Sequence, residues 1–283
     1  MVSATRIKEG PRLQHQSEAG GRTEGLQVAI PRVGTLSRST VITAINRLQE
    51  QHAILEPEVA FMVLRTASRH YNVKLRVVAA ALVATDADVS GDGLIAACEP
   101  PPLSFSCRAQ PPNRTDVMHD LMRAAIGMTR AGYGTVQSRD PIHGGLIIEG
   151  HRGFDRSFLD FFSYVDGPGS ACGATLTGRS QVWVRDVETS TVFAEEERET
   201  MLGAGVRSVL STPLRDERGI VSGVIATYFT QPHHQVDDAT VSWVQRLADE
   251  CARWLRWYDK AVMPTVLRAV HEAAEHTGTI NRV

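Results

Sequence analysis

Apolar residues recur at helical spacing in the front third of the chain, with polar residues between them. One helix is predicted from three apolar positions at this spacing, Ile42, Ile45 and Leu48. A second helix is predicted to begin at Pro57, because proline is tolerated in the first turn of a helix. Asn72 can cap a third helix with its side chain. The pattern therefore predicts a small all-α module of three short helices over residues 38–85.

Two segments without such a pattern flank this module. Residues 1–37 are rich in Gly, Ser, Arg, Gln and Glu, so they are predicted to be a disordered tail. Residues 86–114 contain several prolines and glycines, which stop both helices and central strands. They are predicted to be a linker that is semi-rigid in its proline runs.

Beyond residue 115 the pattern changes to short alternating or apolar stretches separated by helices. The predicted strands lie near Gly134–Ser138, Gly145–His151, Gln181–Asp186, Arg207–Leu214 and Val221–Tyr228. The predicted helices lie near Val117–Ala131, Asp155–Phe162, Glu195–Gly203 and Asp237–Val262. Turn signals at Pro141–Gly144 and Asp216–Gly219 predict two hairpins. The whole indicates an antiparallel sheet flanked by helices, an α+β domain over residues 115–262, followed by a partly helical tail over 263–283.

Composition narrows the class of protein. The 283 residues carry a net charge of −2, which excludes a globally basic nucleic-acid coat, although the positive excess lies at the front and the negative excess at the back. The four cysteines include no C-x-x-C pair, so neither a disulfide framework nor a zinc site is predicted. No apolar stretch is long enough to cross a bilayer, and the N-terminus lacks an apolar signal core. We therefore expect a cytoplasmic protein with no membrane partner.

Four cations gather around the second and third predicted helices. Arg65 and Arg69 share a helix face at i,i+4 spacing, and Lys74 and Arg76 flank the start of the next helix. Guanidinium groups contact RNA phosphates by charge and unpaired bases by stacking. These four residues are therefore candidate RNA-binding residues, and the alternative is an ordinary solvated helix face.

The same segment resembles the ANTAR family, the RNA-binding modules of bacterial transcription antiterminators. The resemblance is carried by Ile42 with Ala44, by Glu58–Phe61 and Leu64-Arg65, and by Asn72–Leu75 with Val78-Ala79. The chain departs from the family where Asn46 and Gln49 replace a Gly and a Met, and where Val77 replaces an acidic residue. The resemblance implies binding to RNA hairpins of nascent transcripts, which prevents a terminator from forming.

The second domain resembles the GAF family. The resemblance is carried by Gly150–Phe154, Gly169–Ala174, Val184–Val187 and Gly205–Leu214. It implies a sensor domain that binds a small molecule between the sheet and the segments covering it. It also implies a set of candidate ligand-binding residues: Phe158, Phe162, Cys172, Thr175, Trp183 and Asp186. The ligand and any cofactor stay unknown, but a cyclic nucleotide is not predicted, because Phe193–Arg198 is only a fragment of that signature.

The leading hypothesis is a signal-responsive antitermination regulator, in which the GAF domain controls an RNA-binding module. The alternative is a GAF-based interaction or assembly protein whose ANTAR-like helices no longer bind RNA. A third hypothesis is a thiol enzyme acting through Cys172 in a glycine-bracketed turn. No nucleophile elbow, zinc-protease motif or Walker loop is present, so an enzyme is not predicted. A homodimer is predicted from the apolar closing helix, which carries Trp243, Trp254 and Trp257.

Overall fold

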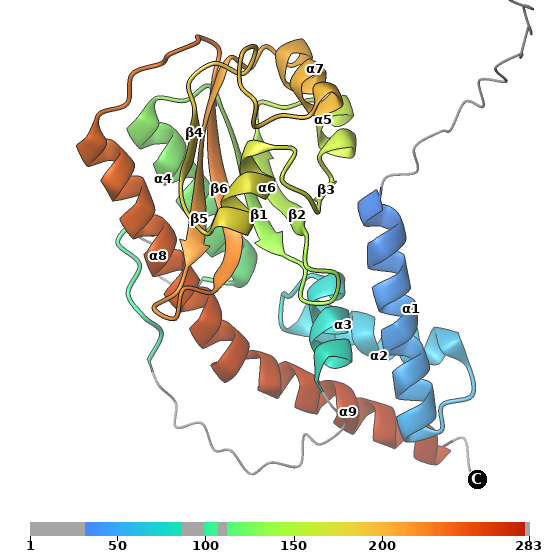
Figure 1. Ribbon diagram of the computed structural model, residues 1–283. Coiled ribbons are helices and arrows are strands. Elements are labelled where there is room, and N and C mark those ends of the chain that lie inside the picture. Colours follow the sequence, from blue (N-terminus) through green and yellow to red (C-terminus); the bar gives the residue numbers. More distant parts are fainter. Residues whose placement is uncertain (1–31, 86–98, 107–111, 281–283) are drawn as a thin grey trace, which may run out of the picture.

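The computed structural model describes residues 32–85, 99–106 and 112–280 (Figure 1). The predicted tail before residue 32 and most of the predicted linker lie outside these residues. The helices are α1 (Arg32–His52), α2 (Pro57–His70), α3 (Leu75–Ala84), α4 (Arg114–Thr129), α5 (Arg156–Phe161), α6 (Ala171–Gly178), α7 (Glu195–Gly203), α8 (Asp238–Ala261) and α9 (Met263–Ile280). The strands are β1 (Tyr133–Arg139), β2 (Leu146–Arg152), β3 (Tyr164–Val165), β4 (Val182–Val184), β5 (Ser208–Arg215) and β6 (Val221–Phe229).

The strands form one antiparallel sheet in the order β3-β2-β1-β6-β5-β4. β1 pairs with β2, and β5 pairs with β6, so both predicted hairpins are present. β1 and β6 join the two hairpins at the centre of the sheet. The predicted fold class, a helical module followed by an α+β domain with an antiparallel sheet, is confirmed.

Two elements of this domain were not predicted. β3 has only two residues, which is too short to show an alternating pattern. α6 is rich in glycine and was predicted as a turn, but the Ser170 Oγ accepts a hydrogen bond from the Gly173 backbone N at 3.1 Å. This contact caps the first turn of α6. The prediction of a turn at Cys172 was therefore wrong, because Cys172 lies inside a helix.

Apolar clusters fill both faces of the sheet. α4 and α8 cover one face, where Val136, Leu214 and Ile225 pack against them. α5, α6 and α7 lie on the other side (Figure 1), over a second cluster that contains several aromatic rings. We call α4 to α8 with the sheet the sheet domain.

The first three helices form the predicted bundle, and α9 completes it. α9 contacts α1, α2 and α3, and Figure 1 shows it running on from α8 beneath them. Its residues Val266, Val270 and Ala274 are fully buried. The segment expected as a partly helical tail over residues 263–283 is helical from Met263 to Ile280. The structure also begins α1 at Arg32, inside the predicted disordered tail. We call α1 to α3 with α9 the helical module.

The helical module and the sheet domain share one apolar core. The cluster that contains Leu48, Leu64 and Leu82 of the module continues into α4 and α8. Part of the predicted linker is attached as well, since the Ser104 Oγ donates to Glu250 Oε2 of α8 at 2.8 Å. The module therefore packs as part of one body. In the described ranges, no helix combines the length and the apolar character needed to cross a membrane.

A histidine pair joins α1 to α9. His52 Nε2 lies 2.9 Å from His271 Nδ1. Burial lowers the pKa of both imidazoles, and His52 lowers the pKa of His271 further, whereas Glu275 acts in the opposite direction on both. Since these folded pKa values lie below the ordinary value of 6.5, the contact stabilises the fold above that pH. Its contribution is lost as the pH falls through the lowered values.

We therefore expect the module to become less stable as the pH falls below 6.5, with no change in this contribution at higher pH. Urea unfolding followed from about pH 8 to about pH 5 measures the effect. His271→Gln should reduce the pH dependence, because it removes one of the two groups that must stay neutral. An unchanged pH dependence in this variant would contradict the expectation.

Candidate functional site at the contact between the module and the sheet

The structure separates the four predicted RNA-binding cations into two pairs. Arg65 and Arg69 lie on α2, where Arg69 is exposed and Arg65 is half-buried. Within the described residues, neither has a carboxylate partner. Lys74 immediately precedes α3, and Arg76 lies in its first turn. Both of these contact the sheet domain, so the four cations do not form one free surface.

The partner of Lys74 and Arg76 is Glu149, which the sequence analysis missed. In the pairing of β1 with β2, Val136 lies opposite Gly150 and Gln137 lies opposite Ile148. Glu149 is therefore the extra residue of a β-bulge. Bulges redirect a side chain and leave the extra residue outside the ladder. The Glu149 side chain is only 3% exposed and faces the module.

One carboxylate thus serves two cations. Glu149 Oε2 lies 2.7 Å from Lys74 Nζ and 2.5 Å from Arg76 Nη2. The Lys74 ammonium also donates to the Glu149 backbone carbonyl at 3.0 Å, and the Ser138 Oγ donates to Oε1 at 2.5 Å. A buried charge is stable only when it is paired and hydrogen-bonded in this way. We call these four residues the Glu149 clamp.

The electrostatics of the clamp favour the ionised carboxylate. Burial by itself raises the pKa of Glu149. The charges of Arg76 and Lys74 act in the opposite direction, together with the hydrogen bonds from Lys74 and Ser138, and they lower this pKa to about 2. Glu149 is therefore ionised at neutral pH although it is buried.

A close approach of α4 to the bulge supports this geometry. His119 Nε2 lies 3.4 Å from the Glu149 carbonyl oxygen. A Cβ at residue 150 would lie 2.4 Å from the His119 ring, so any larger residue here would have to displace that ring from its place beside the bulge. The sequence did contain one signal for the clamp, an acidic residue in the middle of the apolar strand predicted over Gly145–His151.

The structure brings together only part of the predicted ligand-binding set. Phe158, Phe162 and Cys172 line one cavity between the sheet and the helices α5 and α6. Its volume is ≈ 10 Å³, about the space that one water molecule needs. Aromatic rings fill the region, since Phe154 stacks on Phe158 with 3.7 Å between ring centroids. In this structure the site expected for a GAF ligand is therefore occupied by side chains.

The other three candidates lie elsewhere. Thr175 is buried, and its Oγ1 donates to the Ser211 carbonyl at 3.5 Å. The Trp183 ring lies 3.4 Å from the Arg185 guanidinium carbon. Asp186 Oδ1 lies 3.2 Å from Arg207 Nη2. Each of these contacts is structural, and none of the three residues lines the small cavity.

The environment of Cys172 disfavours thiol chemistry. Its Sγ lies 3.7 Å from the Tyr228 Oη, which in turn lies 2.9 Å from Thr135 Oγ1. Burial raises the pKa of the Cys172 thiol, so the nucleophilic thiolate is not favoured at neutral pH. Burial also raises the pKa of Cys251 to about 12. Among the described residues, no group of three or more His, Cys, Asp and Glu side chains is placed to hold a metal ion.

Comparison with known proteins gives one family match. The model of the GAF domain family matches residues 113–254. This match does not include the three helices α1 to α3, so the ANTAR resemblance stays a prediction. No curated protein matches the chain.

Several solved structures match about half of the chain. The GAF domain/HD domain protein from Geobacter sulfurreducens is 18% identical, with 53% of this chain and 97% of that chain covered and a TM-score of 0.45. The GAF domain from Acinetobacter phosphoenolpyruvate-protein phosphotransferase is 15% identical, with 54% and 87% covered and a TM-score of 0.44. The type II free methionine-R-sulfoxide reductase from Thermoplasma acidophilum is 13% identical, with 51% and 96% covered and a TM-score of 0.41.

Proposed function

The chain belongs to the GAF domain family, and on this basis we propose that it is a signal-responsive regulator in which the sheet domain controls the helical module. A GAF domain supports a role in signal sensing. The output that we propose is binding of RNA hairpins in nascent transcripts by the ANTAR-like helices, which favours transcriptional read-through.

The observation that carries this proposal is the Glu149 clamp. It joins a buried carboxylate of the sensory sheet to Lys74 and Arg76, two of the four cations of the candidate RNA-binding set. While the clamp is closed, these two cations are held against Glu149, which competes with phosphates for them. A signal that opens the clamp would add them to Arg65 and Arg69. Control of the output is thus a competition between one carboxylate and RNA for the same cations.

Filter retention of a tandem-hairpin RNA tests this proposal. We expect the wild type to retain the RNA weakly and Glu149→Gln to bind it at least about tenfold more tightly, because a larger fraction of the protein is then competent to bind. The salt dependence should also become steeper, by roughly 0.7 in the log–log slope for each additional phosphate contact. The matched control is the triple variant E149Q/K74A/R76A, which should lose the gain in affinity.

A specific observation favours the alternative function. The helices α1 to α3 share their apolar core with the sheet domain, which suits an interaction or assembly protein whose ANTAR-like helices are structural. If neither the wild type nor Glu149→Gln retains RNA, this alternative replaces the first proposal. We propose a homodimer under either of these two functions. Trp254 is buried inside the chain and Trp243 is half-exposed, so pairing through α8 would use Trp243.

A further inference from the structure

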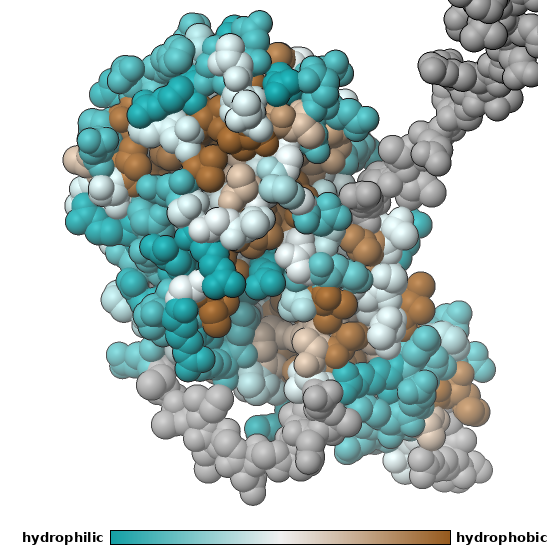
Figure 2. All heavy atoms as spheres, viewed as in Figure 1, coloured by the Kyte–Doolittle hydropathy of each residue, from teal (hydrophilic) through white to brown (hydrophobic). Residues whose placement is uncertain are grey.

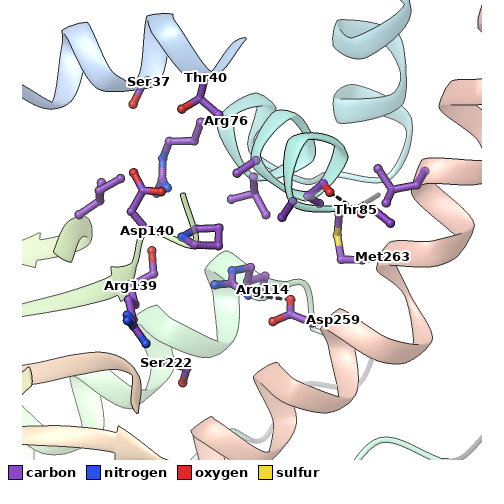
Figure 3. A pocket seen from close by; sticks show the side chains of 18 of the residues that line it. Ser37, Thr40, Arg76, Thr85, Arg114, Arg139, Asp140, Ser222, Asp259 and Met263 are labelled. Atoms are coloured by element: carbon purple, nitrogen blue, oxygen red, sulfur yellow. Dashed lines mark hydrogen bonds and ion pairs between the residues drawn. The ribbon is translucent and has the colours of Figure 1, made fainter. Parts of the chain in front are cut away.

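A large cavity lies between the helical module and the sheet domain. Its volume is ≈ 770 Å³, and its walls come from α1, α3, the hairpin ends of the sheet, and the region where α8 meets α9. Figure 3 shows the side chains that surround it, with α3 above and α8 and α9 at one side. Ligand sites are clefts of about 300–1,000 Å³. This cavity falls in that range, whereas the one beneath α5 and α6 does not.

We propose that this cavity is the effector site and that it binds a small monocarboxylate with an apolar body. The inference deepens the proposed function, because it names the site and the class of the signal. Binding itself does not depend on whether the output is RNA.

The walls indicate an apolar body. α3 contributes Val77, Ala81 and Ala84, whose small side chains leave the space open. Ile220 of the β5–β6 turn, which is 51% exposed, and Leu267 of α9 also line the cavity. Figure 2 shows apolar residues in brown and tan where the sheet domain meets the helices. Covering such surface with an apolar ligand is favourable because it removes the surface from water.

The charged residues of the lining indicate one negative charge on the ligand. Three arginines line the cavity, Arg76, Arg114 and Arg139, against two aspartates, Asp140 and Asp259. Arg114 Nη1 is paired with Asp259 Oδ1 at 3.1 Å. Asp140 already accepts from the Ile142 backbone N at 2.8 Å and lies 3.0 Å from His143 Nδ1.

Among the described residues, two of these arginines, Arg76 and Arg139, have no carboxylate of their own. Arg139 donates its Nε to the Gly144 carbonyl at 3.4 Å, and it has no carboxylate partner in the part of the chain that the structure describes. Arg76 shares Glu149 with Lys74. The side chains of Arg76 and Arg139 both appear on the Asp140 side of the cavity in Figure 3, away from Asp259. The excess of one positive charge fits a monoanion, and a planar carboxylate matches the donor geometry of guanidinium.

Arg76 couples this site to the clamp. It lines the cavity and also holds Glu149, so a ligand carboxylate competes with Glu149 for the same guanidinium. Occupation of the cavity therefore weakens the contact between the module and the sheet. By linkage, the reverse also holds, and a weaker clamp raises the affinity for the ligand by the same factor.

Titration calorimetry with decanoate tests the site. We expect saturable 1:1 binding to the full chain, and binding of decan-1-ol at least about tenfold weaker, because the alcohol lacks the charge. Arg139→Gln and Ile220→Glu should each weaken decanoate at least about tenfold, whereas Ile220→Lys should keep it. The side chains of Arg139 and Ile220 are both exposed, so these variants are expected to fold. Thermal unfolding checks this. Leu55→Glu, at an exposed position away from the cavity, is the surface control.

The outcomes separate this inference from the proposed function. Equal binding of decanoate and decan-1-ol, equal affinity in wild type and Ile220→Glu, or no saturable binding up to about 1 mM would overturn the inference. If decanoate fails while Glu149→Gln still gains RNA, only the identity of the effector site is wrong. If decanoate binds as expected while no variant retains RNA, only the RNA output is wrong.

Discussion

Glu149→Gln is expected to lower the free energy of unfolding by about 3 kcal/mol and to increase hydrogen exchange in α3. The substitution leaves Lys74 and Arg76 next to a neutral amide in a buried contact. Removing one partner of a buried ion pair costs about 3–5 kcal/mol, and the partial exposure of both cations places this case at the low end. Urea unfolding measures the stability, and exchange monitored by mass spectrometry locates the change.

Glu188→Gln is the matched control for this variant. Glu188 Oε2 also pairs with an arginine, Arg207, at 2.7 Å, but its side chain is 62% exposed. Exposed ion pairs contribute about 0–1 kcal/mol, so the same substitution should have little effect there. If both variants lost equally little stability, the clamp would not hold the module.

The clamp also predicts the response to acid. The pKa of Glu149 is lowered from 4.5 to about 2 in the folded protein, so its contribution is fully present above pH 4.5. It is lost as the pH falls from that value toward about 2. The stability of wild type should therefore fall more steeply in this interval than that of Glu149→Gln. Parallel curves would contradict the assignment of the charge to this residue.

Phe158→Ala is expected to be the other severe substitution, with a loss of about 3–5 kcal/mol. Phe158 is 2% exposed and lies between the rings of Phe154 and Phe162, with centroid distances of 3.7 and 4.7 Å. Its removal leaves a large void where the native cavity is ≈ 10 Å³. Urea unfolding gives the loss, and binding of a small aromatic compound such as indole would report the new space.

Phe161 provides the control for this substitution. It lies three residues further along the same short helix, but it is 40% exposed. Phe161→Ala should change the stability by less than about 1 kcal/mol, because a large part of this side chain is already exposed to water in the folded protein. A similar loss in both variants would mean that the aromatic cluster is not what closes this side of the sheet domain.

Much of the fold follows from local patterns. The two hairpins and α8 were predicted correctly, because turn residues and one continuous apolar stripe are local signals. β3 and α6 were missed for the opposite reason. β3 is two residues long, and α6 depends on the cap at Ser170 in a glycine-rich stretch. The order of the strands also had to come from the structure, since pairing of β1 with β6 joins distant segments.

In the candidate site, too, the sequence shows some features and only the structure shows the others. The four cations were visible in the sequence, and so were the aromatic residues beneath α5. What the sequence could not show is that Lys74 pairs with a residue 75 positions away. The bulge that turns Glu149 toward the module depends on the register of β1 against β2, and register is a property of the assembled sheet.

By itself, the sequence determined most of the helices and strands, where the cations lie along the chain, and the GAF character of the second domain. These properties depend on periodicity and on short motifs. Only the tertiary structure decided that α9 completes the helical module, that the expected ligand site is filled by aromatic rings, and that a larger cavity opens beside Arg76. Each of these depends on contacts between residues far apart in the chain, which no local pattern encodes.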